Sequence, residues 1–95
     1  MRWKWSLRAK ADLHRIVHRI AMDNPRAAEQ WLRKVRDRAR LAGRSPGLGR
    51  KAPELDRDDI REAIIGNYRL VYRIDSKVVV IQTIFDGHPL FPGLE

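Results

Sequence analysis

The hydrophobic positions of this chain follow a helical spacing in its first half. Between residues 7 and 22, apolar side chains recur every three or four residues and leave charged side chains on the other face, which is the pattern of an amphipathic helix. A second stripe of this kind runs from residue 25 to residue 42, and Gly43 is expected to end that helix. Because only Asn24 and Pro25 join the two segments, we expect an antiparallel helix hairpin.

The second half of the chain is predicted to form strands. Three runs of β-branched and aromatic residues are separated by hairpin turn signals: residues 60–65, 68–74 and 78–85, with Gly66-Asn67 and Asp75-Ser76-Lys77 between them. The opening segment, residues 2–5, alternates polar and aromatic side chains and is expected to join the same sheet. The predicted order is β-α-α-β-β-β, an α+β fold in which an antiparallel sheet carries the helix hairpin on one face.

Two segments lack any such periodicity. Residues 44–59 are rich in proline, glycine and charge and are predicted to form a loop. A loop of this length is uncommon in a small domain and is often functional. The tail, residues 86–95, contains two prolines and two glycines and is predicted to be irregular. At this length the chain, residues 1–95, is expected to form one domain.

The turn between the first two predicted strands of the second half determines which side chains share a face. If it contains two residues, Tyr68 and Tyr72 face the helices and are expected in the core. Arg69 and Arg73 then point to the opposite face, and Glu62 lies diagonal to both, close enough for an ion pair. The sequence therefore predicts an open sheet face with two arginines in its middle. The alternative is that these arginines only make an exposed face soluble.

The chain has a net charge of +8, and its excess of basic residues lies ahead of the last three predicted strands. Residues 1–57 contain 16 Lys and Arg against 6 Asp and Glu, whereas residues 58–95 contain 4 against 6. A positive field of this kind attracts polyanions and acidic partners. The alternative is a basic face that is simply solvated.

Composition excludes several kinds of site. The chain has no cysteine, so neither a disulfide nor a thiolate metal site can form, and this fits a cytoplasmic protein. No signal peptide is expected, and no apolar run approaches the ~20 residues that span a bilayer, so no membrane contact is expected. His14 and His18 have a metal-binding spacing but no third ligand nearby. We therefore expect them on a helix surface, with no metal and no cofactor.

Familiar catalytic motifs are also missing from the sequence. The chain has no phosphate-binding glycine loop, no nucleophile elbow and no pair of carboxylates at a catalytic spacing. Any chemistry must therefore use arginines, backbone groups and His88, the acid–base candidate of the tail. This restricts catalysis to phosphate chemistry without a metal. The alternative for His88 is a solvated tail histidine.

Five short segments, spread over nearly the whole chain, are weak indications singly and a pattern together: Ile20-Ala21-Met22-Asp23-Asn24-Pro25, Pro46-Gly47-Leu48-Gly49-Arg50, Pro53-Glu54-Leu55, Asp59-Ile60-Arg61-Glu62 and Gly66-Asn67-Tyr68-Arg69-Leu70-Val71-Tyr72-Arg73-Ile74. In this order they resemble the RelE/ParE superfamily of toxins from bacterial type II toxin–antitoxin pairs. The resemblance implies the same α+β fold.

The resemblance also implies one of two activities. RelE-like members cut mRNA in the ribosomal A site and carry basic residues where this chain has Ile60 and Glu62. Their strand arginine is present as Arg69, and His88 stands where they have a second arginine. Phosphodiester cleavage needs cations around its transition state, and a glutamate beside Arg69 would partly neutralise the site and repel phosphate. The chain is therefore identified as a ParE-like member, which implies a gyrase poison without chemistry of its own.

Two alternatives remain open: a ribosome-dependent mRNA endonuclease that uses Arg69 and His88, or an inactive relative that only binds partners. All three hypotheses imply a cognate antitoxin with an acidic or amphipathic segment, and hence a toxin–antitoxin hetero-oligomer. The candidate partner-binding residues are Arg69, Arg73, Glu62, Arg61, Arg33, Arg36, Arg40, Arg50 and Lys51. Lys34 and Arg38 lie on the same predicted helix as Arg33, Arg36 and Arg40 and add to its basic surface.

Overall fold

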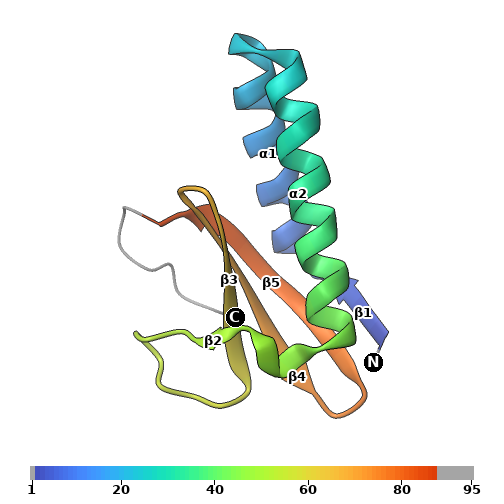
Figure 1. Ribbon diagram of the computed structural model, residues 1–95, viewed down its shortest axis with the longest axis vertical. Coiled ribbons are helices and arrows are strands. Elements are labelled where there is room, and N and C mark those ends of the chain that lie inside the picture. The colour runs from blue at the N-terminus through green and yellow to red at the C-terminus, as the bar shows by residue number, and fades with distance from the viewer. Residues whose placement is uncertain (1, 88–95) are drawn as a thin grey trace.

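A computed structural model of the chain describes residues 2–87 (Figure 1). Its elements are β1 (Arg2–Trp5), α1 (Leu7–Asp23), α2 (Pro25–Arg44), the 3-10 helix η1 (Pro46–Leu48), β2 (Arg50–Lys51), β3 (Ile60–Ile65), β4 (Tyr68–Asp75) and β5 (Val78–Asp86). The predicted α+β order is confirmed, and the predicted boundaries of α1, β4 and β5 differ by one residue from those observed. The predicted irregular tail begins in β5, and from residue 88 on it lies outside the described residues.

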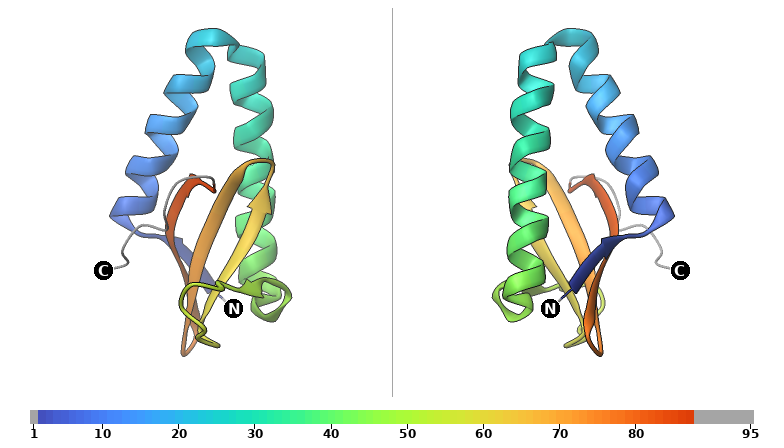
Figure 2. Two further views of the ribbon diagram at one scale, coloured as in Figure 1. Left: turned by 90° about the vertical axis from the view of Figure 1, so that its left-hand side faces the viewer. Right: turned by 90° about the vertical axis from the view of Figure 1, so that its right-hand side faces the viewer.

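Asn24 makes the helix hairpin possible because it ends α1 and begins α2. Its backbone N–H donates to the carbonyl of Ile20 at 2.9 Å, and its side chain accepts from the N–H of Ala27 at 3.1 Å. Pro25 follows at the first helical position, where a missing N–H costs nothing. The two helices lie on the same side of the sheet, and the end of the hairpin near Asn24 extends beyond the sheet (Figure 2).

Gly43 was expected to end α2, and that prediction is wrong. The helix continues to Arg44 and is capped by Ser45. Gly43 lies inside the helix because the aromatic ring of Trp3 occupies the space of its missing side chain: a Cβ atom there would lie 2.4 Å from Trp3 Cδ1. The glycine therefore serves close packing of α2 against β1.

The sheet has the strand order β1-β5-β4-β3-β2. β3, β4 and β5 form the predicted antiparallel meander, and the register Ile65↔Tyr68 confirms the two-residue turn. β1 joins the sheet as expected and pairs with β5 in parallel, so the sheet is mixed, and its antiparallel part is the predicted one together with β2. The helix hairpin returns the chain to the end of the sheet where β1 starts (Figure 1). β3 runs in the direction of β1, β4 runs the opposite way, and β5 runs in the direction of β1 again.

The main core lies between the sheet and the helices. Tyr72 and Leu70 of β4 pack there against apolar side chains of both helices, as the register predicts. Trp3, Trp5 and Trp31 are packed against the same core. Neither helix in the described part of the chain has an apolar stretch long enough to cross a membrane.

The opposite face of the sheet was predicted to be open, and it is covered. Residues 52–59 cross it, and Ala52 packs with Ile60 and Val71 in a second buried cluster that Leu55 and Phe85 extend. Apolar side chains on this face need a cover to leave water. The predicted 44–59 loop supplies it and also contains the short elements η1 and β2.

Candidate functional site

A row of alternating charges crosses the sheet face that points away from the helices. It consists of Arg50 in β2, Glu62 in β3, Arg69 in β4 and Glu54 in the segment after β2, and we call it the charge ladder. Arg50 Nε donates to Glu62 Oε2 at 2.5 Å, and Arg69 Nε donates to Glu62 Oε1 at 2.9 Å. Arg69 also donates two hydrogen bonds to Glu54, from Nη1 to Oε2 and from Nη2 to Oε1, both 2.7 Å long.

The two central members of the charge ladder are buried. Glu62 is 1% exposed and Arg69 is 8% exposed, and the guanidinium carbon of Arg69 lies 5.2 Å from the ring centroid of Phe85. A buried charge is tolerated only when opposite charges and hydrogen bonds replace its lost hydration. Glu62 has two arginines for this purpose and Arg69 has two glutamates, so the four side chains together are electrically neutral.

The ladder also fixes the protonation of its outer glutamate. The hydrogen bonds from Arg69 lower the pKa of Glu54 to about 2. In return, the hydrogen bonds to Glu54, followed by those to Glu62, raise the pKa of Arg69. Both groups therefore stay charged throughout the physiological pH range. A general acid or base needs a pKa near the working pH, so this pair is unsuited to proton transfer.

Arg69 and Arg73, predicted to share an open face, have different surroundings. The predicted ion pair between Glu62 and Arg69 is confirmed. The predicted pairing of Glu62 with Arg73 is wrong, because Arg73 Nη1 lies 3.6 Å from Asp75. The second carboxylate oxygen of Glu62 binds Arg50 instead. Arg50 lies in β2, within the segment that the sequence predicts to be a loop. An approaching phosphate would have to displace Glu54 before it could bind Arg69.

Arg61 and Lys51 hold residues 52–59, the covering segment of the sheet face, in place. Arg61 donates to two backbone carbonyls, Gly49 O at 3.0 Å and Asp58 O at 2.9 Å. Lys51 Nζ lies 3.4 Å from Asp56 and 3.3 Å from Asp58, and bonding to Asp58 raises the pKa of Lys51. These two candidate partner-binding residues therefore have structural contacts of their own.

Tyr72 joins the helix face of the sheet to η1. Its hydroxyl donates to Pro46 O at 2.6 Å and accepts from Gly49 N at 3.1 Å. A Cβ atom at Gly49 would lie only 2.1 Å from that hydroxyl oxygen, so the close approach requires glycine. Burial raises the pKa of Tyr72. Tyr72 is thus a core residue, as predicted.

The helix candidates lie apart from the charge ladder. Arg33, Arg36 and Arg40 are exposed on α2. His14 and His18 are exposed on α1, as expected, and within residues 2–87 no three His, Asp or Glu side chains are grouped to hold a metal ion. His88 lies outside the described residues.

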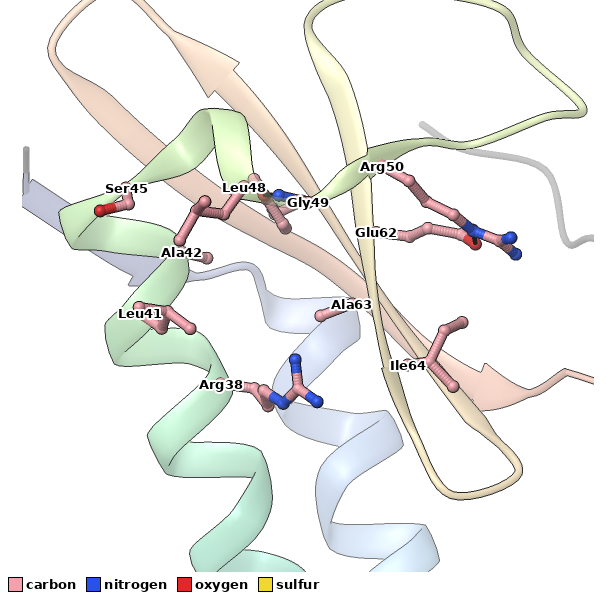
Figure 3. Close-up of a pocket in the computed structure, with 11 residues that line it drawn as sticks. Arg38, Leu41, Ala42, Ser45, Leu48, Gly49, Arg50, Glu62, Ala63 and Ile64 are labelled. Atoms are coloured by element: carbon pink, nitrogen blue, oxygen red, sulfur yellow. Dashed lines mark hydrogen bonds and ion pairs between the residues drawn. The ribbon is translucent and has the colours of Figure 1, made fainter.

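A groove with apolar walls runs between α2 and β3 (Figure 3). It has a volume of about 220 Å³. Leu41 of α2, Leu48 of η1 and Ile64 of β3 line it, and they are three of the five large hydrophobic side chains exposed in the described part of the chain. Arg38 and Arg50 also line the groove. This concentration of exposed apolar surface beside positive charge suits an amphipathic, acidic segment.

The three apolar side chains of this groove were not among the site residues predicted from the sequence. Leu41 offers the one available signal, because it falls outside the buried stripe of α2 that contains Val35, Ala39 and Ala42. Ile64 is exposed partly because β2 pairs only with Glu62 and Arg61. In the described chain, β3 from Ala63 to Ile65 is paired on one side only, with β4.

Comparisons with known proteins agree with this architecture. A family model described as ParE toxin of type II toxin-antitoxin system, parDE, matches residues 3–89. A solved structure titled "Chromosomal ParDE TA system from P. aeruginosa" matches with a TM-score of 0.73 and 20% sequence identity, covering 90% of this chain and 95% of that chain. A search of curated proteins finds no match. At this identity the structural match establishes a shared fold.

Proposed function

We propose, from the premise that this chain belongs to the ParE toxin family of type II toxin–antitoxin systems, that it inhibits DNA gyrase by binding and is neutralised by a cognate antitoxin. Gyrase acts on chromosomal DNA, so the proposed site of action is the bacterial cytoplasm. The proposal assigns no chemical step to the protein.

The observation that carries this proposal is that Arg69 is already bound to two glutamates. A ribonuclease of this fold would need a cation facing the scissile phosphate and a group able to transfer protons. Here Arg69 is 8% exposed and holds two glutamates, and the pKa of Glu54 is about 2. A carboxylate already occupies the anion site, which favours a binding toxin over the endonuclease alternative.

A paired assay tests the choice of target. The purified protein is titrated into a gyrase supercoiling reaction and, separately, into a translation reaction whose mRNA is followed by primer extension. We expect loss of supercoiling and intact mRNA. Full supercoiling at excess protein would refute gyrase inhibition, and mRNA cleavage that Arg69→Ala abolishes would establish the endonuclease. Inactivity in both assays would favour the inactive partner-binding relative.

For the antitoxin, we propose docking in the groove between α2 and β3. The occupant we propose is an antitoxin segment with apolar side chains against Leu41, Leu48 and Ile64 and acidic side chains toward Arg38. Exposed apolar surface of this kind gains free energy when it is covered. Arg38, unlike Arg50, has no carboxylate partner among the described residues, so it adds charge complementarity that favours an acidic partner over a basic one.

A matched pair of leucine variants tests the docking site. Leu48 and Leu7 are both exposed, at 70% and 84%, but only Leu48 lines the groove. The probe is the protein encoded beside the gene for this chain, with affinity measured by calorimetry. Loss of a central apolar contact costs about 1–2 kcal/mol or more, so we expect Leu48→Glu to weaken binding at least about tenfold and Leu7→Glu to leave it unchanged. Equal affinities for the two variants would place the antitoxin elsewhere.

A further inference from the structure

The outward face of α2 carries a stripe of arginines that the site described above does not use. Its members are Arg26, Arg33, Arg36, Arg40 and Arg44, and all five are exposed. Their spacing places Arg26, Arg33 and Arg44 on the side of the helix opposite Val35, which is buried in the core, and Arg36 and Arg40 on the adjoining flank. The stripe therefore faces away from the sheet along much of the helix.

The charge of this stripe is mostly unneutralised. Among the described residues, only Arg40 has an ion-pair partner in the stripe, Asp37 at 3.6 Å, and both side chains are well exposed. Five basic residues of β2, β4 and residues 52–59 differ in this respect, because they have carboxylate partners: Arg50, Lys51, Arg57, Arg69 and Arg73. The excess positive charge of the described chain is therefore concentrated on α2, which contains seven Arg and Lys against two Asp and Glu.

The geometry of the stripe fits an extended polyanion. An α-helix rises about 1.5 Å per residue, so the guanidinium groups from Arg33 to Arg44 originate along a line of about 16 Å. The one large apolar side chain of α2 that is exposed, Leu41, lines the groove on another side of the helix. The hairpin also projects past the sheet (Figure 2), so a rod-shaped partner can approach the stripe. Closely spaced arginines with little exposed apolar surface between them match a phosphate backbone better than a protein surface.

We propose that this arginine stripe binds the phosphate backbone of double-stranded DNA without regard to sequence. DNA binding by itself does not depend on the identity of the toxin target. Its contribution to poisoning rests on the proposed function, because the stripe would hold the toxin against the DNA on which gyrase acts. The groove and the stripe use different sides of α2, so antitoxin docking and DNA binding are separable by substitution.

The test is fluorescence anisotropy with a labelled 20-base-pair duplex between 50 and 200 mM KCl. Each neutralised phosphate contributes about −0.9 to the slope of log affinity against log salt, so four arginines predict a slope of about −3.6 and an affinity loss of about 150-fold over this range. Arg36→Gln/Arg40→Gln should reduce the slope to about −1.8. Glutamine and arginine have similar helix propensities, so α2 is expected to stay intact.

The matched control is Lys4→Gln/Lys77→Gln, which removes the same charge from two exposed positions outside α2. It should retain the slope of the unmodified protein. The proposal is overturned if the protein does not bind the duplex at 50 mM KCl, or if the two double variants lose equal affinity. Tighter binding to a 20-nucleotide single-stranded RNA than to the duplex would also overturn it.

The outcome separates this inference from the proposed function. If gyrase is inhibited but the duplex is not bound, the DNA-binding inference fails and gyrase inhibition stands. If the duplex is bound through the stripe but supercoiling continues, gyrase inhibition fails and DNA binding stands. In both cases Arg36→Gln/Arg40→Gln should bind the antitoxin as the unmodified protein does.

Discussion

Replacing Glu62 by glutamine tests whether the charge ladder stabilises the fold. The substitution keeps the shape of the side chain and removes the negative charge between Arg50 and Arg69. Arg69, 8% exposed, would then depend on Glu54, whose side chain is 40% exposed. We expect the free energy of unfolding to fall, because a buried guanidinium would lose half of its compensation.

The magnitude follows from the burial of each pair. Removing one partner of a buried ion pair costs about 3–5 kcal/mol. The bond to Arg50 adds little, because exposed pairs contribute about 0–1 kcal/mol and the Arg50 side chain is 61% exposed. Glutamine retains an acceptor oxygen, so we take the lower end, about 3 kcal/mol. For a domain of this size, this corresponds to a fall in Tm of about 12–24 °C.

Urea denaturation and thermal melting followed by circular dichroism measure this change. The control is Asp75→Asn, which breaks the exposed pair with Arg73 and should cost less than about 1 kcal/mol. A cost below about 1 kcal/mol for Glu62→Gln would refute the reasoning, because it would mean that water already hydrates Arg69. If Glu62→Gln does not fold, Glu62→Gln/Arg69→Gln should restore part of the stability, since the uncompensated charge is gone.

Three further outcomes follow from particular contacts. Glu54 has a pKa of about 2 in the folded protein, below its unfolded value, so its contribution to stability is complete above about pH 4.5 and is lost as the pH falls toward about 2. Glu54→Gln should remove this loss of stability, which amounts to under about 1 kcal/mol over that window because the carboxylate is partly exposed. Gly49→Ala should cost about 1–3 kcal/mol in urea denaturation. The cost should be smaller in a Tyr72→Phe background, because the closest clash is with the Tyr72 hydroxyl oxygen, although Tyr72 Cζ at 2.8 Å and Glu62 O at 2.9 Å would remain close. An equal cost in both backgrounds would contradict this cause. Gly43→Ala should lower Tm although alanine favours helices by about 1 kcal/mol, because its methyl group would meet the Trp3 ring, and a higher Tm would show that the ring moves aside.

Much of the fold follows from local patterns. The three- and four-residue spacing of apolar side chains places both helices, and Asn24-Pro25 places the turn between them. The two-residue turn at Gly66, with its positive φ of 59°, sets the register of β3 and β4. That register alone puts Glu62 beside Arg69. The physical reason is that periodicity and turn geometry depend on neighbours in the sequence.

Only the tertiary structure decided what covers the face of the sheet that points away from the helices. Glu54 reaches Arg69 across 15 residues of sequence, and Leu41 meets Ile64 in one groove although they lie on different elements. The parallel pairing of β1 with β5 joins the first and last strands of the sheet in sequence order. Segments such as residues 52–59 have no periodicity, so their position depends on which apolar surface and which charge the rest of the fold leaves uncompensated. The sequence alone therefore determined which residues share a face of the sheet, and the tertiary structure turned a predicted open arginine face into a closed and neutral one.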